Sequence, residues 1–244
     1  MNMRTVLAIT GTDRVDFLQG LITNDVTRAE GGIVYAALLT PQGKFIADFF
    51  VIGKPDTLLI DVDSSVGATL FQRLSMYRLR ADVQIIEAAL IVSRGTGPRP
   101  DGALDDPRHS ALGWRHYGDQ DISDQTVDWP AIEVANLIPS TGVDLIPDTY
   151  ILEANFEAIN GVDFKKGCFV GQEIVARMKH KSTLKKGLRR VSFDGDAATG
   201  DTIMSGDKLA GTLHSVHGNQ GIAYLRFDRT SAMTTQKASL HLTD

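Results

Sequence analysis

Apolar residues in the first half of the chain recur with the period of two that indicates strands and, in two places, with helical spacing. The strand-like runs cover residues 4–10, 33–40, 44–52, 57–62 and 82–88. Two of these runs flank Pro41-Gln42-Gly43, and such a short Pro/Gly loop between β-prone runs is typical of a hairpin. A short helix capped by Thr12 or Asp13 and a longer helix after Ser64 or Ser65 complete this half.

The second half opens with a loop or linker over 94–110, which holds three prolines and three glycines. Signals over 122–149 are mixed, but Pro130 suits the first turn of a helix. The helical patterns of this half cover 131–137, 150–159 and about 170–180. From Gly187 onward, short apolar runs separated by turn residues predict a small all-β module of about 55 residues.

Composition narrows the class of protein. Of 244 residues, 43% are hydrophobic and 23% charged, which are ordinary values for a globular chain. The single cysteine, Cys168, excludes an intramolecular disulfide and disfavours a self-contained iron–sulfur cluster, which usually takes about four thiolates. His214 and His217 have no third ligand nearby, so their spacing is more typical of a surface than of a zinc site.

The chain lacks the apolar segments that membranes and secretion require. No run approaches the ~20 apolar residues of a membrane span. The apolar stretch behind Met1 is shorter than the ~7 residues of a secretory signal. We therefore expect a reduced, cytoplasmic protein with no membrane partner.

Charge is unevenly distributed along the chain. Residues 165–190 hold nine basic side chains and one acid, a net charge of +8, and the whole chain is at −5, which leaves −13 elsewhere. Residues 119–128 hold four aspartates and no base. A basic segment in an acidic protein is either a solvated face that balances the fold or an anion site, and composition alone favours neither.

The segment around Cys168 combines several features of a reactive site. Gly167 permits a turn that other residues resist. Cys168 is expected at a strand-to-helix junction beside Lys165 and Lys166, where unpaired N–H groups and ammonium charge both favour the thiolate. No histidine lies next to Cys168 in the sequence to act as a base for nucleophilic catalysis. The competing interpretation is that Cys168 is a small, buried apolar residue.

The polar residues of the helix that follows either stabilise the helix or bind a ligand. Glu173 and Arg177 are four residues apart with the acid first, an order that supports a helix by a few tenths of a kcal/mol. The alternative is that Gln172 and Glu173, near the helix start, bind a ligand as hydrogen-bond donor and acceptor. For Glu173, helix support is the favoured interpretation.

Residues 166–173 spell Lys-Gly-Cys-Phe-Val-Gly-Gln-Glu, and this octapeptide resembles the signature of the YgfZ family, the folate-binding proteins of iron–sulfur maintenance. That family includes mitochondrial iron–sulfur assembly proteins and is a sister of the glycine-cleavage T-protein, a tetrahydrofolate-dependent aminomethyltransferase. Weaker blocks of the same resemblance are Phe17-Leu18-Gln19-Gly20-Leu21 with Thr23-Asn24-Asp25, Pro41-Gln42-Gly43-Lys44, Asp106-Pro107-Arg108 with Leu112-Gly113-Trp114-Arg115, and Glu153-Ala154-Asn155.

The resemblance implies an α+β, T-protein-like fold of three parts around a central channel. The expected parts are an N-terminal folate-binding α+β domain of residues 1–45 with 114–185, a ferredoxin-like domain of 46–113, and a C-terminal β-barrel of 186–244. Tetrahydrofolate or a derivative would bind in the channel, its pterin in an apolar slot edged by a carboxylate and its glutamates on a basic rim. The expected folate contacts are Asp48, Glu153, Lys166, Gly167, Gln172, Glu173 and Arg177, and Cys168 is the expected functional thiol.

Two departures from the T-protein pattern bear on activity. T-proteins carry two adjacent acids in the strand after their Gly-Gly turn, and this chain has Ala47-Asp48 there. Side chains alternate along a strand, so one acid cannot serve both faces, and aminomethyl transfer is disfavoured. The chain is also short for the family, with the difference expected within 94–150.

Three functional hypotheses compete. The first is a folate-dependent accessory protein, not a conventional enzyme, for assembly or repair of iron–sulfur enzymes, with tRNA-modifying enzymes among its candidate clients. The alternative is a T-protein-like one-carbon transferase. The third is direct RNA binding through 177–190, where the lack of aromatic residues disfavours single-strand recognition, so any tRNA contact is expected to be indirect or weak. We expect a monomer.

Overall fold

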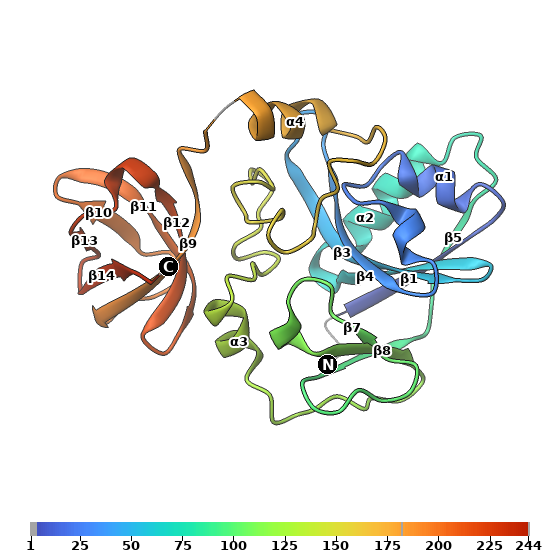
Figure 1. Cartoon of the computed structure of the whole chain (residues 1–244), viewed down its shortest axis with the longest axis horizontal. Helices are drawn as coiled ribbons and strands as arrows, with labels where there is room; N and C mark the ends of the chain where they lie inside the picture. Colours follow the sequence, from blue (N-terminus) through green and yellow to red (C-terminus); the bar gives the residue numbers. More distant parts are fainter. Residues whose placement is uncertain (1–3, 182, 244) are drawn as a thin grey trace. The chain divides into compact units, whose positions relative to one another are not determined.

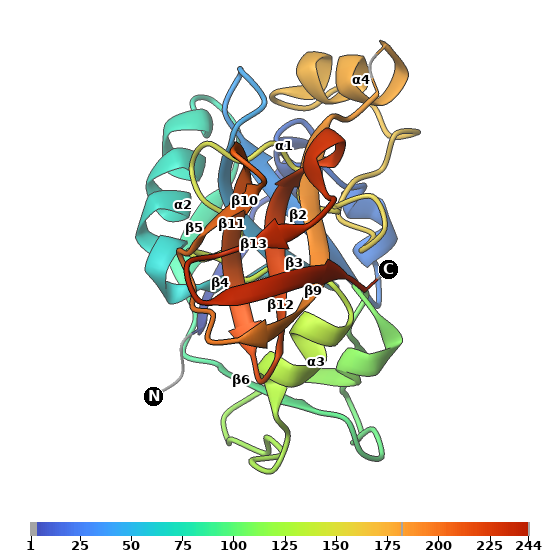
Figure 2. The same cartoon turned by 90° about the vertical axis from the view of Figure 1, so that its left-hand side faces the viewer.

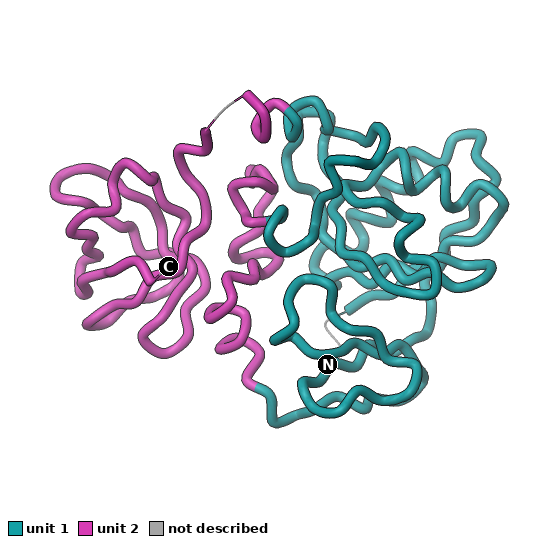
Figure 3. Tube along the Cα trace, in the orientation of Figure 1, with its two compact units in different colours: residues 1–127, 156–176 teal, residues 128–155, 177–244 magenta. Residues whose placement is uncertain are grey.

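The computed structural model describes residues 4–181 and 183–243. They form two compact units, each built from two stretches of chain (Figure 3). Unit 1 combines Met1–Val127 with Phe156–Ala176, and unit 2 combines Asp128–Asn155 with Arg177–Asp244. The expected division into three parts stays a prediction.

Unit 1 is built on a five-stranded antiparallel sheet with the strand order β2-β3-β4-β1-β5 (Figure 1). Its strands are β1 (Arg4–Thr10), β2 (Ile33–Leu39), β3 (Phe45–Lys54), β4 (Thr57–Asp63) and β5 (Gln84–Glu87). The five strand-like runs and the hairpin around Pro41-Gln42-Gly43 are confirmed. The domain boundary expected after residue 45 falls at the start of β3, so this sheet takes strands from both sides of it.

Two helices cover one face of the sheet. They are α1 (Arg14–Gln19) and α2 (Ser64–Tyr77), and Asp63 caps α2 by accepting from the Ser65 N–H, where Ser64 or Ser65 was the expected cap. Every second residue of the strands points toward these helices, as alternation requires. The resulting core includes Leu7, Ile9, Leu18, Ala36, Leu38, Ala47, Phe49, Val51, Ile60, Val62, Leu70 and Leu74.

Unit 1 also holds a smaller antiparallel sheet of three strands. They are β6 (Ile91–Gly95), β7 (Leu104–Asp105) and β8 (Trp114–Gly118), in the order β6-β8-β7. The expected loop over 94–110 is therefore wrong in part, because the end of β6 and all of β7 lie within it. Short 3₁₀ turns lie at Val26–Ala29 and Ser110–Leu112.

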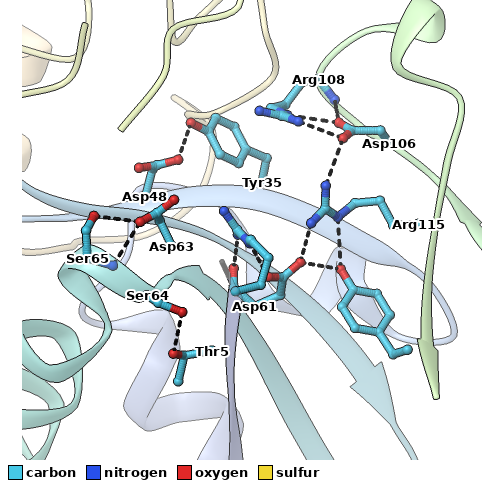
Figure 4. A network of polar contacts seen from close by, with 12 residues as sticks. Thr5, Tyr35, Asp48, Asp61, Asp63, Ser64, Ser65, Asp106, Arg108 and Arg115 are labelled. Carbon is cyan, nitrogen blue, oxygen red and sulfur yellow. Dashed lines mark hydrogen bonds and ion pairs between the residues drawn. The ribbon is translucent and has the colours of Figure 1, made fainter. Parts of the chain in front are cut away.

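The opposite face of the large sheet carries a buried carboxylate. Asp61 on β4 is fully buried, and it accepts from Arg4 Nε at 2.6 Å, Arg115 Nη2 at 2.5 Å and the Tyr117 hydroxyl at 2.9 Å (Figure 4). Burial alone would raise the pKa of Asp61, but the two guanidinium groups overcome it and hold the pKa at about 2. Strand β8 is tied to this face because Arg115 and Tyr117 belong to it.

A second ion pair extends this network. Arg115 Nη1 lies 3.5 Å from Asp106, which accepts two hydrogen bonds from the guanidinium of Arg108, at 3.0 and 2.8 Å (Figure 4). The guanidinium of Arg108 lies 4.9 Å from the centre of the Phe50 ring and 5.4 Å from that of Tyr35. Aromatic faces attract such cations. Planar cations and rings therefore pack on this face around Asp61.

The returning segment of unit 1 is held by the turn after α1. Thr23 donates its hydroxyl to the Gly161 carbonyl at 2.7 Å, and the Asn24 amide donates to the Asn160 carbonyl at 2.8 Å. Phe156 packs its ring 5.3 Å from that of Tyr35. Residues 156–176 are thus part of unit 1 although they follow a stretch of unit 2.

Unit 2 is built on a closed six-stranded barrel (Figure 2), and it also holds helix α3 and the second half of α4 (Gln172–Lys181). Its strands are β9 (Lys186–Gly195), β10 (Thr202–Ser205), β11 (Lys208–His217), β12 (Gln220–Arg226), β13 (Met233–Thr234) and β14 (Ala238–Leu242), with a 3₁₀ turn at Phe227–Arg229 and helix α3 at Trp129–Ala135. The expected all-β module and the helix behind Pro130 are confirmed. Within 4–181 and 183–243, each helix is too short or too polar to cross a lipid bilayer.

The two remaining helical expectations have opposite outcomes. Helix α4 (Gln172–Lys181) confirms the helix expected over about 170–180. The helix expected over 150–159 is wrong, because residues 151–160 form turns. Asn155 has a φ of +65° and Asn160 a φ of +56°. These left-handed residues interrupt the backbone that an α-helix needs.

We predict that Asp61→Asn lowers the free energy of unfolding by about 3–5 kcal/mol at pH 7, because it removes one partner of a buried ion pair. The usual pKa of 3.8 is lowered to about 2 in the folded protein. The charged form therefore stabilises the fold above pH 3.8, and this contribution of about 2 kcal/mol is lost as the pH falls toward 2. Urea unfolding of both proteins from about pH 5 to 2 should show the difference between their free energies of unfolding narrowing by about 2 kcal/mol.

The exposed Asp56 provides the control for this prediction. Asp56→Asn should stay close to the unsubstituted protein across the same pH range, within about 0.5 kcal/mol. A gap between Asp61→Asn and the unsubstituted protein that does not change with pH would contradict the assignment of the charged form.

Candidate functional site

Cys168 lies in an exposed, irregular segment in front of helix α4. The strand expected before it is absent from this described segment, since residues 164–166 form a turn and 167–169 have no regular structure. Phe169, next to it, is buried at 8% exposure. The thiol is therefore accessible, and it is not the buried packing residue of the competing interpretation.

Lys166 anchors the upstream end of this segment. Its ammonium donates to the Gln19 carbonyl at 2.7 Å and to the Ile22 carbonyl at 2.6 Å, at the end of α1. Burial lowers the pKa of Lys166 to about 8, against the opposing effect of Asp25 and Asp163. Two of its three N–H donors are used inside unit 1, one on a carbonyl in the last turn of α1 and one on a carbonyl of the turn that follows.

Gly171 anchors the downstream end. Its φ is +85°, and a Cβ atom there would lie 2.7 Å from the Thr40 carbonyl oxygen. The neighbouring Gly43 has a φ of +75° and leaves room for Ile174 of α4, whose side chain would be 2.8 Å from a Cβ. The hairpin loop between β2 and β3 therefore packs directly on the start of α4.

Gly167 does not have the role that the sequence suggested for it. A Cβ atom there would meet no heavy atom within 4 Å, and its φ lies outside the left-handed region. The turn does not require this glycine, whereas the close approach at Gly171 does.

The polar residues of α4 differ in their exposure. Gln172 is half-buried, whereas Glu173 and Arg177 are exposed. Within the part of the chain that the structure describes, no ion pair joins these last two residues, so the expected salt bridge along the helix is not formed. Both remain accessible to a ligand.

Asp48 lies on β3, on the same face of the sheet as Asp61, and is 4% exposed. It accepts a hydrogen bond of 2.9 Å from the Tyr35 hydroxyl (Figure 4). Burial, together with the charge of Asp48, raises the pKa of Tyr35 well above its usual value, so this hydroxyl stays a donor. The neighbouring Ala47 points to the helix-covered core.

Sequence reasoning missed the network that surrounds Asp48. Asp61 was present as a single acid inside the apolar run 57–62, and a charge at such a position indicates a buried partner. Arg108 and Arg115 stood in motifs that were used only for family resemblance. The pairing of Arg115 with Asp61 could not be predicted, because 54 residues separate them in sequence. The partner of Arg108 is Asp106, two residues earlier, so that pair lay within one motif.

Glu153 belongs to unit 2 and is 8% exposed. Its Oε2 accepts from the Tyr224 hydroxyl at 2.5 Å and lies 3.9 Å from the Lys186 ammonium. Burial and this carboxylate raise the pKa of Tyr224. The backbone carbonyl of Glu153 accepts from the Leu188 N–H at 2.7 Å, which fixes the loop to strand β9 of the barrel.

The expected site residues thus fall in both units. Asp48, Lys166, Gly167, Cys168, Gln172 and Glu173 belong to unit 1, and Glu153 and Arg177 belong to unit 2. Within residues 4–181 and 183–243, no group of three or more His, Cys, Asp or Glu side chains is arranged to hold a metal ion. His214 lies 3.8 Å from Asp144 and His217 lies 3.3 Å from Asp128.

We predict that Gly171→Ala lowers the free energy of unfolding by about 2 kcal/mol or more, because the new methyl group clashes with the Thr40 carbonyl at a left-handed residue. The same change at Gly167, four residues earlier, should alter it by less than about 0.5 kcal/mol. Urea unfolding of the two variants in parallel provides the measurement. Equal effects of the two changes would contradict the role given to the close approach.

Comparison with known proteins identifies the fold and several relatives. Residues 185–244 match the family model described as the CAF17 C-terminal beta-barrel domain. The glycine cleavage system aminomethyltransferase T of Bartonella henselae superimposes with a TM-score of 0.78 and 14% identity, over 100% of this chain and 83% of that chain. The expected T-protein-like fold is confirmed.

Relatives in sequence share one name. The mouse protein "Iron-sulfur cluster assembly factor IBA57, mitochondrial" is 28% identical over 98% of this chain and 78% of its own length. The human protein of that name is 29% identical over 91% and 75%. A homolog from Neurospora crassa is 32% identical over 76% of this chain, which spans about half (51%) of that relative. The resemblance to the YgfZ family itself stays a prediction.

These names overturn the expectation of a cytoplasmic protein, because the mouse, human and fungal relatives are all named mitochondrial. The expectation rested on the absence of a secretory signal peptide, which carries no information about import into an organelle. The chain has the fold of the aminomethyltransferase T-protein, and the relatives that it resembles in sequence are mitochondrial iron–sulfur cluster assembly factors.

Proposed function

We propose that this protein is an iron–sulfur cluster assembly factor that acts as an accessory to iron–sulfur enzymes. The observation that carries the proposal is the similarity to the mouse factor of that name, which extends over 98% of this chain and 78% of the relative. The similarity therefore extends over the barrel, the large sheet and the segment around Cys168. Enzymes that modify tRNA remain candidate clients within this proposal.

Cys168 is the residue through which the protein would contact a cluster or its ligands. One thiolate cannot hold a cluster that takes about four, so the remaining ligands would come from a partner protein. The thiol is exposed, and its segment is anchored by Lys166 on α1 and by Gly171 on the hairpin loop. This arrangement presents a thiol on a supported segment, as transfer between proteins requires.

We further propose that tetrahydrofolate or a derivative binds to this protein. A pterin ring presents amino and ring N–H donors, and a carboxylate is the matching acceptor. Asp48 in unit 1 and Glu153 in unit 2 are carboxylates of this kind, each nearly buried and each oriented by a tyrosine hydroxyl. Bound folate would supply one-carbon or redox chemistry, while a carboxylate such as Asp48 would bind and orient its ring.

The alternative function, aminomethyl transfer of the T-protein type, is less well supported. The position adjacent to Asp48 is Ala47, and its methyl group lies in the core between sheet and helices. The carboxylate of Asp48 already accepts from Tyr35. A second acid on this strand, as the T-protein pattern has, is not available. A turnover assay with an aminomethyl donor and tetrahydrofolate would distinguish the two functions.

We predict that Cys168→Ala leaves the melting temperature within about 2 °C, because an exposed side chain contributes little to packing. The same variant should abolish rescue of iron–sulfur enzyme activity in cells that lack the protein. Asp56→Asn, at an exposed position outside the expected site, should rescue fully. A stable Cys168→Ala variant that also rescues fully would reject the functional role of the thiol.

We predict that tetrahydrofolate binds to the unsubstituted protein in calorimetry and that Asp48→Asn weakens this binding by about 10- to 100-fold, the value of a hydrogen bond to a charged group. The exposed Asp119 offers a matched control, and Asp119→Asn should bind as the unsubstituted protein does. Absence of any heat of binding at millimolar tetrahydrofolate would rule out the folate part of the proposal and leave the assembly role standing.

A further inference from the structure

The turn after helix α2 presents a basic and apolar surface that the core of unit 1 does not use. Leu79 is 87% exposed and Met76 is 60% exposed. Arg78 and Arg80 on either side of Leu79 are exposed, and the exposed Arg73 lies one helical turn before Met76. We call these five residues the α2 tip.

Leu79 occupies a backbone position that favours glycine or asparagine. Its φ is +40°, and it is a central residue of a turn closed by the Ala81 N–H, which donates to the Arg78 carbonyl at 2.8 Å. A residue with a Cβ atom is strained in this left-handed region. A leucine that is both strained and exposed adds nothing to folding, and such local violations concentrate at functional sites.

The ionisable side chains of the α2 tip carry positive charge only. Residues 64–81 contain no acidic side chain. The flanking acids Asp63 and Asp82 accept hydrogen bonds from Ser65 and Thr12, not from these arginines. In the part of the chain that the structure describes, Arg73, Arg78 and Arg80 form no ion pair. Three cations and two exposed apolar side chains thus share one short surface in an acidic protein.

We propose that the α2 tip binds an anionic lipid surface, with Leu79 and Met76 entering the headgroup region and the arginines contacting lipid phosphates. Exposed aliphatic side chains beside basic residues are typical of such interfacial contacts. A protein partner would need about 20–30 residues on each side, commonly anchored by tryptophan or tyrosine, and the five residues of the tip include neither. This contact does not depend on the proposed function.

The expectation of no membrane partner rested on the length of apolar segments, which detects only chains that cross a bilayer. Binding at the surface needs no spanning helix, because a few apolar side chains and the charge of the lipid headgroups act together. The net charge of −5 does not prevent it, since at physiological salt the repulsion is screened beyond about 8 Å.

Co-sedimentation of the full chain with lipid vesicles tests the proposal. The probes are vesicles of phosphatidylcholine alone and vesicles that also contain roughly 30% phosphatidylglycerol. We expect binding to the second kind only, weakened at about 0.5 M salt. The double change Arg78→Gln and Arg80→Gln should weaken binding about 30-fold, because each cation near an anionic surface contributes roughly fivefold.

The variant Leu79→Gly distinguishes a contribution of this side chain to lipid binding from a contribution to the stability of the fold. Glycine suits the φ of +40°, so the melting temperature should be unchanged or higher, while vesicle binding falls by about tenfold or more. Leu209→Ser is the matched control, because Leu209 is an exposed leucine (54%) beside Lys208 on the barrel. That variant should bind vesicles as the unsubstituted protein does.

Three results would overturn the proposal: equal binding to uncharged vesicles, no binding to either kind, or full binding by Leu79→Gly. Sedimentation velocity adds a fourth. If the unsubstituted protein is a dimer and Leu79→Gly a monomer, the α2 tip joins two copies of the chain, and the lipid contact is rejected.

Discussion

The buried carboxylate of Asp61 is the constraint on which the second face of the large sheet depends. A charge at the centre of a sheet is tolerated only with partners of opposite charge, and Arg4 and Arg115 supply them. Because Arg115 is on β8, this requirement ties the small sheet to the large one. Arg115 also reaches Asp106, which in turn orients Arg108 over the rings of Tyr35 and Phe50.

This network also determines the surroundings of Asp48. The register of β2, β3 and β4 places Tyr35 opposite Phe50, and Phe50 opposite Asp61. Asp48 is two residues before Phe50 on the same face, within reach of the Tyr35 hydroxyl. A candidate ligand-binding carboxylate is therefore held by a tyrosine whose ring is packed under a fixed guanidinium, and such support on strands is stiffer than support on a loop.

Alternating apolar residues were enough to predict the five strands of the sheet and the barrel, because each strand buries one face against a core. Local pattern failed where a single residue departs from regular backbone. The apolar spacing of 150–159 indicated a helix, but the left-handed φ of Asn155 interrupts the helical backbone there. The same limit affected the glycines of the signature segment. Gly171 matters because of the Thr40 carbonyl, 131 residues earlier in the chain, whereas Gly167 faces open space.

The discontinuous chain path of unit 1 has a consequence for its synthesis. The large sheet is complete in sequence at residue 87, but Phe156 and the segment that caps the end of α1 through Lys166 come only by residue 176. At a translation rate of roughly 5–20 residues per second, the ~90 intervening residues take on the order of 5–20 s to appear. During that interval the ring of Tyr35 and the carbonyls of Gln19 and Ile22 lack partners that the finished unit provides. A nascent chain of this length thus exposes an aromatic ring and backbone carbonyls that the finished unit covers.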